Sequence, residues 1–333
     1  MTPEVQTDTL SLDLNIERFL FIGREPLRHR LRKFEERLEN SYLFTGPPGA
    51  GKLDLALYFA RAILCPEHGC GTCSSCRATS FGTHPDIIVL NRSSNFIELG
   101  DVRATLKFAT QTPAVSSHRV VLIPEIHLGQ RSAPTLLKTV EEPPATTIFL
   151  FTAESVEDEV VPIASRCIQV KVPRFSEEGV RAYLETVETS LSNIETMIAG
   201  SAGRLDFARA LVTNQELVKY LETWAGVLSK IRTSPWLLSE LAQKLEPIPL
   251  AQGSASRAEK AMQTRRKDAD QISMGMNYLL RSIIATRPVN SYLATQAKTL
   301  LTQAHSSLRL NISTPLVLRE LIFSLAHTVL AAE

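Results

Sequence analysis

The sequence lacks an excess of either charge, because 36 lysines and arginines stand against 35 aspartates and glutamates. A formal charge of +1 indicates no broadly basic surface, so any contact with nucleic acid has to come from a local patch. The chain also lacks an apolar run of about 18 residues and a basic amino-terminal region followed by an apolar one. Neither a membrane-spanning helix nor a signal peptide is therefore predicted, and we expect a cytoplasmic protein.

Familiar catalytic side-chain sets are missing as well. No Ser/His/Asp set, pair of catalytic carboxylates or histidine metal motif stands out along the chain. Cysteine is scarce, with five in 333 residues, yet four of the five lie within residues 65–76. In a reducing cytoplasm, such clustering favours a metal site over disulfides.

The clustered cysteines have the spacing C-x4-C-x2-C-x2-C, with glycines that relax the backbone between them. This spacing favours a closed, structural zinc site with four thiolate ligands. The predicted ligands are Cys65, Cys70, Cys73 and Cys76. Three alternatives stay open, namely His68 in place of one cysteine, an iron–sulfur cluster and a set of free thiols, although no Cys-Pro follows as in ferredoxins. Cys167 lies beside an apolar strand and is expected to be a buried small residue.

Apolar residues make up 44% of the chain, enough for the cores of two or three domains. Residues 41–172 alternate short apolar runs with amphipathic segments, which predicts an α/β domain whose mostly parallel sheet has helices on both faces. The β pattern then stops. We expect three domains: an α/β domain at 1–172, a small helical domain at 173–212 and a helical bundle at 213–333.

The segment "GPPGAGK" follows an apolar strand and opens a helix, which is the context of a phosphate-binding loop. The loop comprises Gly46, Pro47, Pro48, Gly49, Ala50, Gly51 and Lys52. Leu53 stands where a Ser or Thr hydroxyl would hold magnesium, and Pro124 stands where an acidic metal partner is expected. We therefore expect a loop that keeps the groups for binding ATP or another anion and lacks those for hydrolysing ATP. The alternative is a turn that is glycine-rich by coincidence.

Four segments together, "YLFTGPPGAGK", the cysteine run with "GTHPD", "LLKTVEEPP" and "SRC", resemble the clamp-loader subunits of bacterial DNA polymerase III, which are AAA+ proteins. The loss of both magnesium contacts makes the chain similar to the δ′ subunits and unlike the γ and τ motor subunits. The resemblance spans at least residues 20–210. It implies an AAA+ phosphate-loop domain with an inserted zinc module, a helical lid and an all-helical collar for oligomerisation.

The resemblance also implies roles for single residues. Arg166 of "SRC" is expected to act as an arginine finger on the ATP of a neighbouring subunit, since its forked donors and permanent charge suit a γ-phosphate. Glu125, Thr152 at the sensor position and Arg204 of "GSAGR" are expected at the degenerate nucleotide site. An arginine that only caps or salt-bridges its own helix is the alternative for Arg166.

Function follows from the same resemblance. We expect a δ′ subunit that is not catalytic by itself and that helps its γ/τ and δ partners load the β sliding clamp onto primed DNA. One rival is an ATP-hydrolysing γ/τ-type subunit, which the missing magnesium contacts disfavour. The other is a zinc-containing DNA-binding adaptor with a decayed nucleotide fold.

Overall fold

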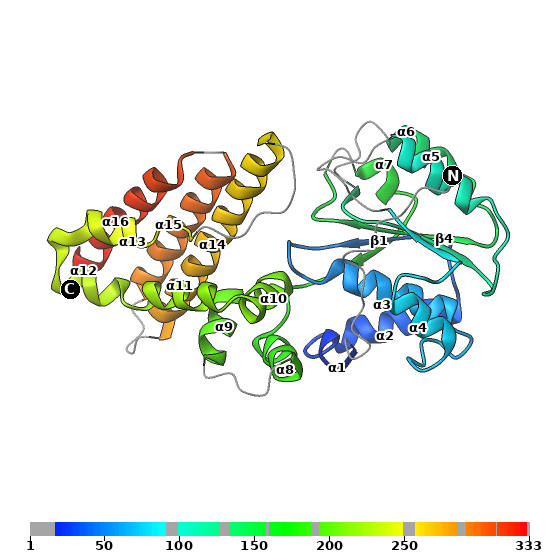
Figure 1. The fold of residues 1–333 in the computed structure, drawn as a ribbon, viewed down its shortest axis with the longest axis horizontal. Coiled ribbons are helices and arrows are strands. Elements are labelled where there is room, and N and C mark those ends of the chain that lie inside the picture. The colour runs from blue at the N-terminus through cyan, green and yellow to red at the C-terminus, as the bar shows by residue number, and fades with distance from the viewer. Residues whose placement is uncertain are drawn as a thin grey trace. The chain divides into compact units, whose positions relative to one another are not determined.

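The computed structural model describes residues 17–90, 99–126, 133–157, 160–187, 193–248, 257–285, 291–310 and 312–331. The chain divides into two compact units, Met1–Tyr183 and Leu184–Glu333 (Figure 1). The boundary lies inside a helix, and residues 184–212 group with the helices that follow them. The finer division into three domains stays a prediction, and residues 1–16 of its first domain lie outside the described residues.

The first unit is built on a five-stranded sheet in which every pair of neighbouring strands is parallel. Its order is β2-β3-β4-β1-β5, so β1, which leads into the candidate phosphate loop, lies between β4 and β5. The strands are β1 (Ser41–Thr45), β2 (Ile87–Val89), β3 (Arg119–Ile123), β4 (Thr147–Ala153) and β5 (Ile168–Lys171). The prediction of an α/β domain with a parallel sheet is confirmed.

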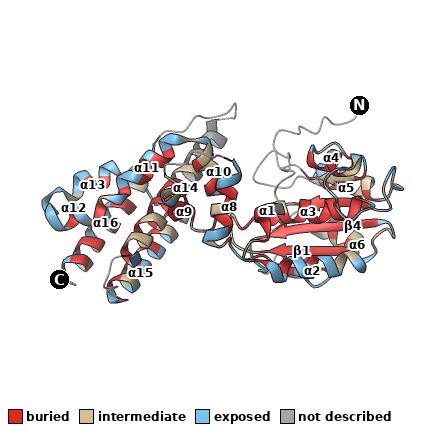
Figure 2. Ribbon diagram, turned by 90° about the horizontal axis from the view of Figure 1, so that it is seen from below, coloured by how far each residue is buried: buried red, intermediate tan, exposed pale blue. Residues whose placement is uncertain are grey.

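Helices cover both faces of this sheet, as Figure 1 shows. On one face lie α5 (Leu99–Ala109), α6 (Ala133–Glu141) and α7 (Val161–Ala164), and on the other lie α2 (Glu25–Glu36), α3 (Lys52–Leu64) and α4 (Ser74–Ser80). The short α1 (Glu17–Leu20) precedes them, and α8 (Glu177–Val187) follows the sheet. Because both faces are covered, β1 and β4 are buried along their whole length (Figure 2).

Side chains of β1 alternate between two cores, as a strand requires. Leu43 packs into the layer beneath α5, α6 and α7 together with Phe149 and Phe151 of β4. Tyr42 and Phe44 point to the opposite face, where each ring lies against Phe59 of α3 with its plane steeply inclined. These apolar layers hold the carboxyl ends of β1, β3 and β4 at one edge of the sheet.

Every regular element in the described part of the second unit is helical. Its helices are α9 (Ile194–Ser201), α10 (Leu205–Thr213), α11 (Gln215–Ala225), α12 (Val227–Thr233), the 3-10 helix η2 (Pro235–Leu237), α13 (Leu238–Lys244), α14 (Arg257–Ala285), α15 (Ser291–Arg309) and α16 (Thr314–Ala331). One apolar core, with Trp224 fully buried, joins α11 to α16. Within the described ranges, no helix combines the length and apolar character needed to span a bilayer.

Candidate functional site

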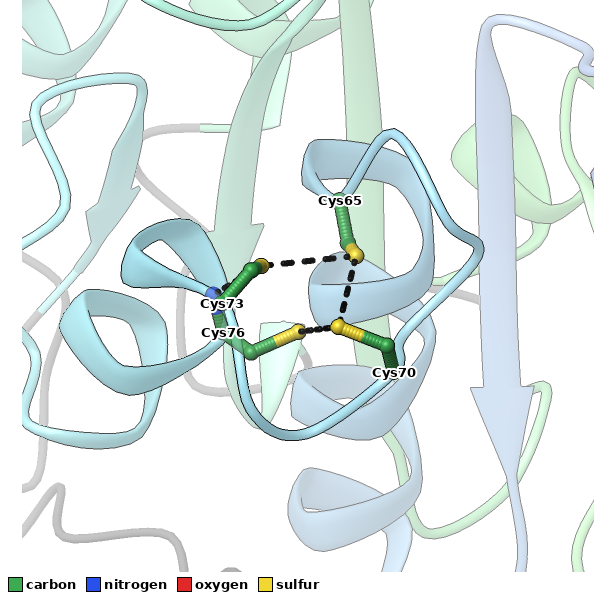
Figure 3. A group of neighbouring side chains, drawn as sticks. All are labelled: Cys65, Cys70, Cys73 and Cys76. Atoms are coloured by element: carbon green, nitrogen blue, oxygen red, sulfur yellow. Dashed lines mark hydrogen bonds between the residues drawn. The ribbon is translucent and has the colours of Figure 1, made fainter.

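The four clustered cysteine sulfurs converge on one point (Figure 3). The Sγ atom of Cys65 lies 3.8 Å from that of Cys70 and 3.6 Å from that of Cys73, and the Cys70 and Cys76 sulfurs are 4.0 Å apart. A tetrahedral ion with metal–sulfur bonds of about 2.3 Å requires sulfurs about 3.8 Å apart. Both the donor set and its spacing therefore fit a metal ion. His68 does not belong to this converging group.

Local backbone geometry explains why the chain converges there. Cys65 ends α3, and Cys73 is the N-cap of α4, so two helix termini supply ligands. Gly69 and Gly71 reverse the loop between them with φ angles of 88° and 77°, a region that residues with a Cβ rarely adopt. The short cysteine spacing alone does not bring the sulfurs together without these turns.

Backbone amides also point at the sulfurs. The N–H of Cys76 donates to the Cys73 sulfur and the N–H of Gly71 donates to the Cys76 sulfur, with a nitrogen–sulfur distance of 3.3 Å in each case. A hydrogen bond from the Thr72 hydroxyl, with help from backbone amides, lowers the pKa of Cys70 to about 6, whereas burial raises the pKa of Cys76. Thiolates are the form in which cysteine binds metals, and the amides that point at the sulfurs would stabilise that form.

Cys167 lies apart from this group. It is partly buried against the core beneath α5, α6 and α7, and burial raises its pKa to about 12. A thiol held neutral in this way fits the expectation of a small core residue.

The phosphate-loop candidate connects β1 to α3. Gly51 precedes α3 with a φ of 75°, and Gly46 approaches the backbone so closely that a Cβ there would lie 2.1 Å from the Val172 carbonyl oxygen. The Lys52 side chain is 5% exposed, and its Nζ donates to the carbonyl oxygens of Gly46 at 2.9 Å and Pro47 at 3.2 Å. The lysine is thus partnered by its own loop.

Two more of the expected nucleotide-site residues lie beside this lysine. Glu125 places Oε1 3.6 Å from Lys52 Nζ, and its own N–H donates to the Thr152 hydroxyl at 2.9 Å. The three residues meet at the edge where β1, β3 and β4 end, so the structure brings them together. The side chains of Leu53 and Pro124 carry no oxygen that could bind magnesium.

No local sequence pattern indicated that Arg24 contacts this loop. Its buried guanidinium lies 3.6 Å from the centre of the Phe175 ring and donates through Nη2 to the carbonyl oxygens of Ala50, at 3.0 Å, and Pro173. Burial lowers its pKa to about 10, against an opposing effect of Asp54. Arg24 therefore ties the phosphate loop to the segment that follows β5.

Arg166 follows α7 and is 38% exposed. Its Nη1 donates to the Pro162 carbonyl oxygen at 2.7 Å and to the Ser165 hydroxyl at 3.1 Å, while Nη2 lies 2.5 Å from Glu141 Oε1. The two contacts of Nη1 are to a residue of α7 and to the adjacent residue in the chain. Such contacts are those of an arginine that caps its own helix, the alternative given above for Arg166. The guanidinium nevertheless reaches the surface.

Arg204 belongs to the second unit. Its guanidinium forms a two-point contact with Asp206, with distances of 3.1 and 2.6 Å, and stacks at 3.5 Å over the Phe207 ring. Asp270 lies 3.6 Å away. These contacts all lie within that unit.

Comparison with known proteins gives concordant results. Residues 27–176 match the family model described as DNA polymerase III, delta subunit. The delta-prime subunit of Pseudomonas aeruginosa DNA polymerase III is 30% identical over 223 residues, which cover 63% of this chain and 67% of the relative. The delta-prime subunit of Bacillus subtilis is 31% identical over 137 residues, or 40% of this chain and 42% of the relative.

Other relatives are longer proteins. The tau/gamma subunit of Haemophilus influenzae is 34% identical over 161 residues, which cover 46% of this chain and 23% of that subunit. The chain spans less than a third of the length of this and two further tau subunits that it matches. A gamma subunit-related protein from Thermotoga maritima aligns with 91% of this chain and 99% of its own, with a TM-score of 0.49 and 16% identity. From the extent of the P. aeruginosa match, the chain belongs to the family of DNA polymerase III delta-prime subunits.

Proposed function

We propose that this chain is the delta-prime subunit of a clamp loader, which helps γ/τ and δ subunits place the β sliding clamp on primed DNA. The observation that carries the proposal is a phosphate loop that keeps its lysine but has Leu53 and Pro124 at the magnesium positions, in a chain of this family. The same observation argues against the motor-subunit alternative, because hydrolysis depends on a metal ion that neutralises the phosphates.

The surroundings of Lys52 support an idle nucleotide site. A phosphate entering the loop has to compete for the lysine with two carbonyl oxygens and with Glu125. Glu125 adds negative charge at the position where a phosphate would add more, which opposes anion binding in a buried setting. Weak ATP binding with little or no hydrolysis is the proposed behaviour of this loop.

Chemistry in the complex is assigned to Arg166. Its Nη1 is anchored by Pro162 and Ser165, whereas Nη2 faces an exposed carboxylate of Glu141. A γ-phosphate of a neighbouring subunit would replace that carboxylate as the acceptor for Nη2. A guanidinium keeps its charge at any physiological pH and offers paired donors to the oxygens on which charge develops.

The cysteine cluster is proposed to hold zinc in a structural module at residues 65–76. Four thiolates close the tetrahedral shell, so no ligand position is left for a substrate or an activated water. Zinc would supply folding free energy to a segment that has little apolar core of its own. Zinc rather than iron is favoured by the absence of the ferredoxin spacing.

The remaining parts of the proposal concern assembly. Residues 173–212 would form the lid and residues 213–333 the collar through which the subunits associate. Contacts with the clamp and with primed DNA are proposed for the complex as a whole.

The decisive experiment assembles the complex with Arg166→Ala and measures DNA-stimulated ATP hydrolysis and clamp loading. Loss of an arginine finger is expected to slow hydrolysis at the adjoining ATP site by about 10³-fold. The ATPase rate of the whole complex should therefore fall by at least the fraction that this one site contributes. Arg37→Ala is the matched control, because the Arg37 side chain is 90% exposed and lies on the surface after α2. Unchanged ATPase and loading with Arg166→Ala would remove the trans-acting role.

A further inference from the structure

The four clustered cysteines differ in how far solvent reaches them. Cys76 is fully buried, Cys65 is 4% exposed and Cys73 is partly buried, whereas Cys70 is exposed. Cys70 also lines a cavity of about 850 Å³ whose other walls come from α2, α3 and the loop that follows α3. Of the four cysteines, Cys70 is therefore the one most open to a small solute.

Exposure decides which of these sulfurs reacts. In a loaded site all four ligands are thiolates, because cysteine binds a metal ion in its deprotonated form. The susceptibility of a cysteine to oxidation follows its thiolate character and its exposure. Since thiolate character is common to all four ligands, exposure separates them. An oxidant in solution therefore meets Cys70 first.

Two neighbours of Cys70 are placed to complete a disulfide with it. The Cys70 sulfur lies 3.8 Å from that of Cys65 and 4.0 Å from that of Cys76. Disulfide sulfurs are about 2.0 Å apart, so the two atoms have to approach by about 2 Å. Cys70 lies on the loop between α3 and α4 (Figure 3), and a Cβ added at the adjacent Gly71 would meet nothing within 4 Å. The loop thus has room for this movement.

We propose that Cys70 is a redox-sensitive ligand through which a peroxide opens the cysteine cluster and releases its metal ion. The inference rests on the proposed zinc site. The Cys70 thiolate attacks hydrogen peroxide, so an S–O bond forms, the O–O bond breaks and hydroxide leaves, which gives a sulfenic acid. The sulfur of Cys65 or Cys76 then attacks that of Cys70, so an S–S bond forms, the S–O bond breaks and a second hydroxide leaves.

This reaction removes two of the four metal ligands. Two thiolates are oxidised by two electrons in all, and one peroxide is reduced to two hydroxide ions. The two thiolates that remain leave half of the tetrahedral shell open, so the ion is released and the segment loses the folding free energy that the ion supplies. A thiol reductant restores both ligands by disulfide exchange, which makes the module a reversible switch.

Release of zinc from the full chain tests this. The zinc-loaded protein is treated with one equivalent of hydrogen peroxide, a chromophoric chelator reports the free ion, and mass spectrometry of peptides identifies the disulfide. We expect loss of one zinc and formation of one disulfide per chain, joining Cys70 to Cys65 or Cys76, with both changes reversed by dithiothreitol and added zinc. Cys65 and Cys73, whose sulfurs are only 3.6 Å apart, would form the disulfide if distance decided instead of exposure.

The control is Cys167→Ser, because Cys167 lies outside the cluster and its loss should leave the rate of zinc release unchanged. Slower release from this variant would implicate Cys167 and overturn the inference. A first disulfide that lacks Cys70, or a chain that keeps its zinc in peroxide, would overturn it as well and leave the proposed metal site intact. A wild-type chain that binds no stoichiometric zinc would instead refute that site, and the inference with it.

Discussion

Asp86, in the "GTHPD" segment, provides the sharpest test of the structure outside the proposed sites. Its carboxylate is fully buried and accepts three backbone hydrogen bonds from the loop before β3. Ala114 donates to Oδ1 at 2.6 Å, while Val115 and Ser116 donate to Oδ2 at 2.8 Å each. Arg119 places Nη2 3.9 Å from Oδ1. We predict that Asp86→Asn loosens this loop and destabilises the first unit.

The magnitude follows from these contacts. An asparagine that turns its carbonyl oxygen toward Val115 and Ser116 presents its amide group to the Ala114 N–H, so a donor meets a donor. A hydrogen bond to a charged acceptor contributes about 1.5–3 kcal/mol, and an unsatisfied buried group costs about 1–3 kcal/mol. Loss of the charge beside Arg119 adds to this. We expect a decrease of about 3 kcal/mol in the free energy of unfolding.

Urea unfolding gives the free energy, and native-state hydrogen exchange at residues 114–116 reports on the loop itself. Asp101→Asn is the matched control, because Asp101 is exposed in the first turn of α5 and its charge is worth about 0.5 kcal/mol there. If Asp86→Asn stays within about 0.5 kcal/mol of the wild type, the proposed contribution of the three hydrogen bonds is wrong.

The same contacts predict a pH dependence. Burial raises the pKa of Asp86, but the hydrogen bonds from Ala114, Ser116 and Val115 outweigh it and hold the pKa below its ordinary value. A carboxyl group whose pKa is lower in the folded state stabilises the fold above its unfolded pKa of about 3.9 and loses this contribution as the pH falls further. The stability difference between wild type and Asp86→Asn should therefore narrow below about pH 4. A difference that widens would contradict this sign.

Two further predictions concern other parts of the chain. A Cβ at Gly275 would lie 2.1 Å from Cε2 of the buried Trp224, so Gly275→Ala should lower the free energy of unfolding of the second unit by about 1–3 kcal/mol, as measured with urea. Gly226→Ala is the control, because a Cβ there would meet no atom closer than 3.5 Å. Equal stability of the two variants would contradict this packing. The isolated chain should hydrolyse ATP no faster than its Lys52→Ala variant, and turnover of roughly 1 s⁻¹ or more that depends on Lys52 would contradict an idle loop.

Local patterns sufficed to predict the α/β domain. Strands such as β3 and β4 are short apolar runs because both faces of a parallel sheet are covered. Such a run can be recognised in the sequence without knowing which strand pairs with it. The cysteine group was predictable for a similar reason, since all four ligands lie within twelve residues and their spacing reflects the turns between them. The division into three domains and the roles of Arg166 and Arg204 stay predictions.

What the sequence by itself determined is therefore set by short-range chemistry: the strand pattern, the glycine-rich turn between β1 and α3, and the convergence of four thiols. Only the tertiary structure decided which distant groups satisfy these segments. Arg24 reaches Ala50 and Pro173, Asp86 holds the loop at residues 114–116, and Glu141 meets Arg166. Buried charges need partners, but the partner is chosen by packing between elements far apart in the chain, which no local pattern records.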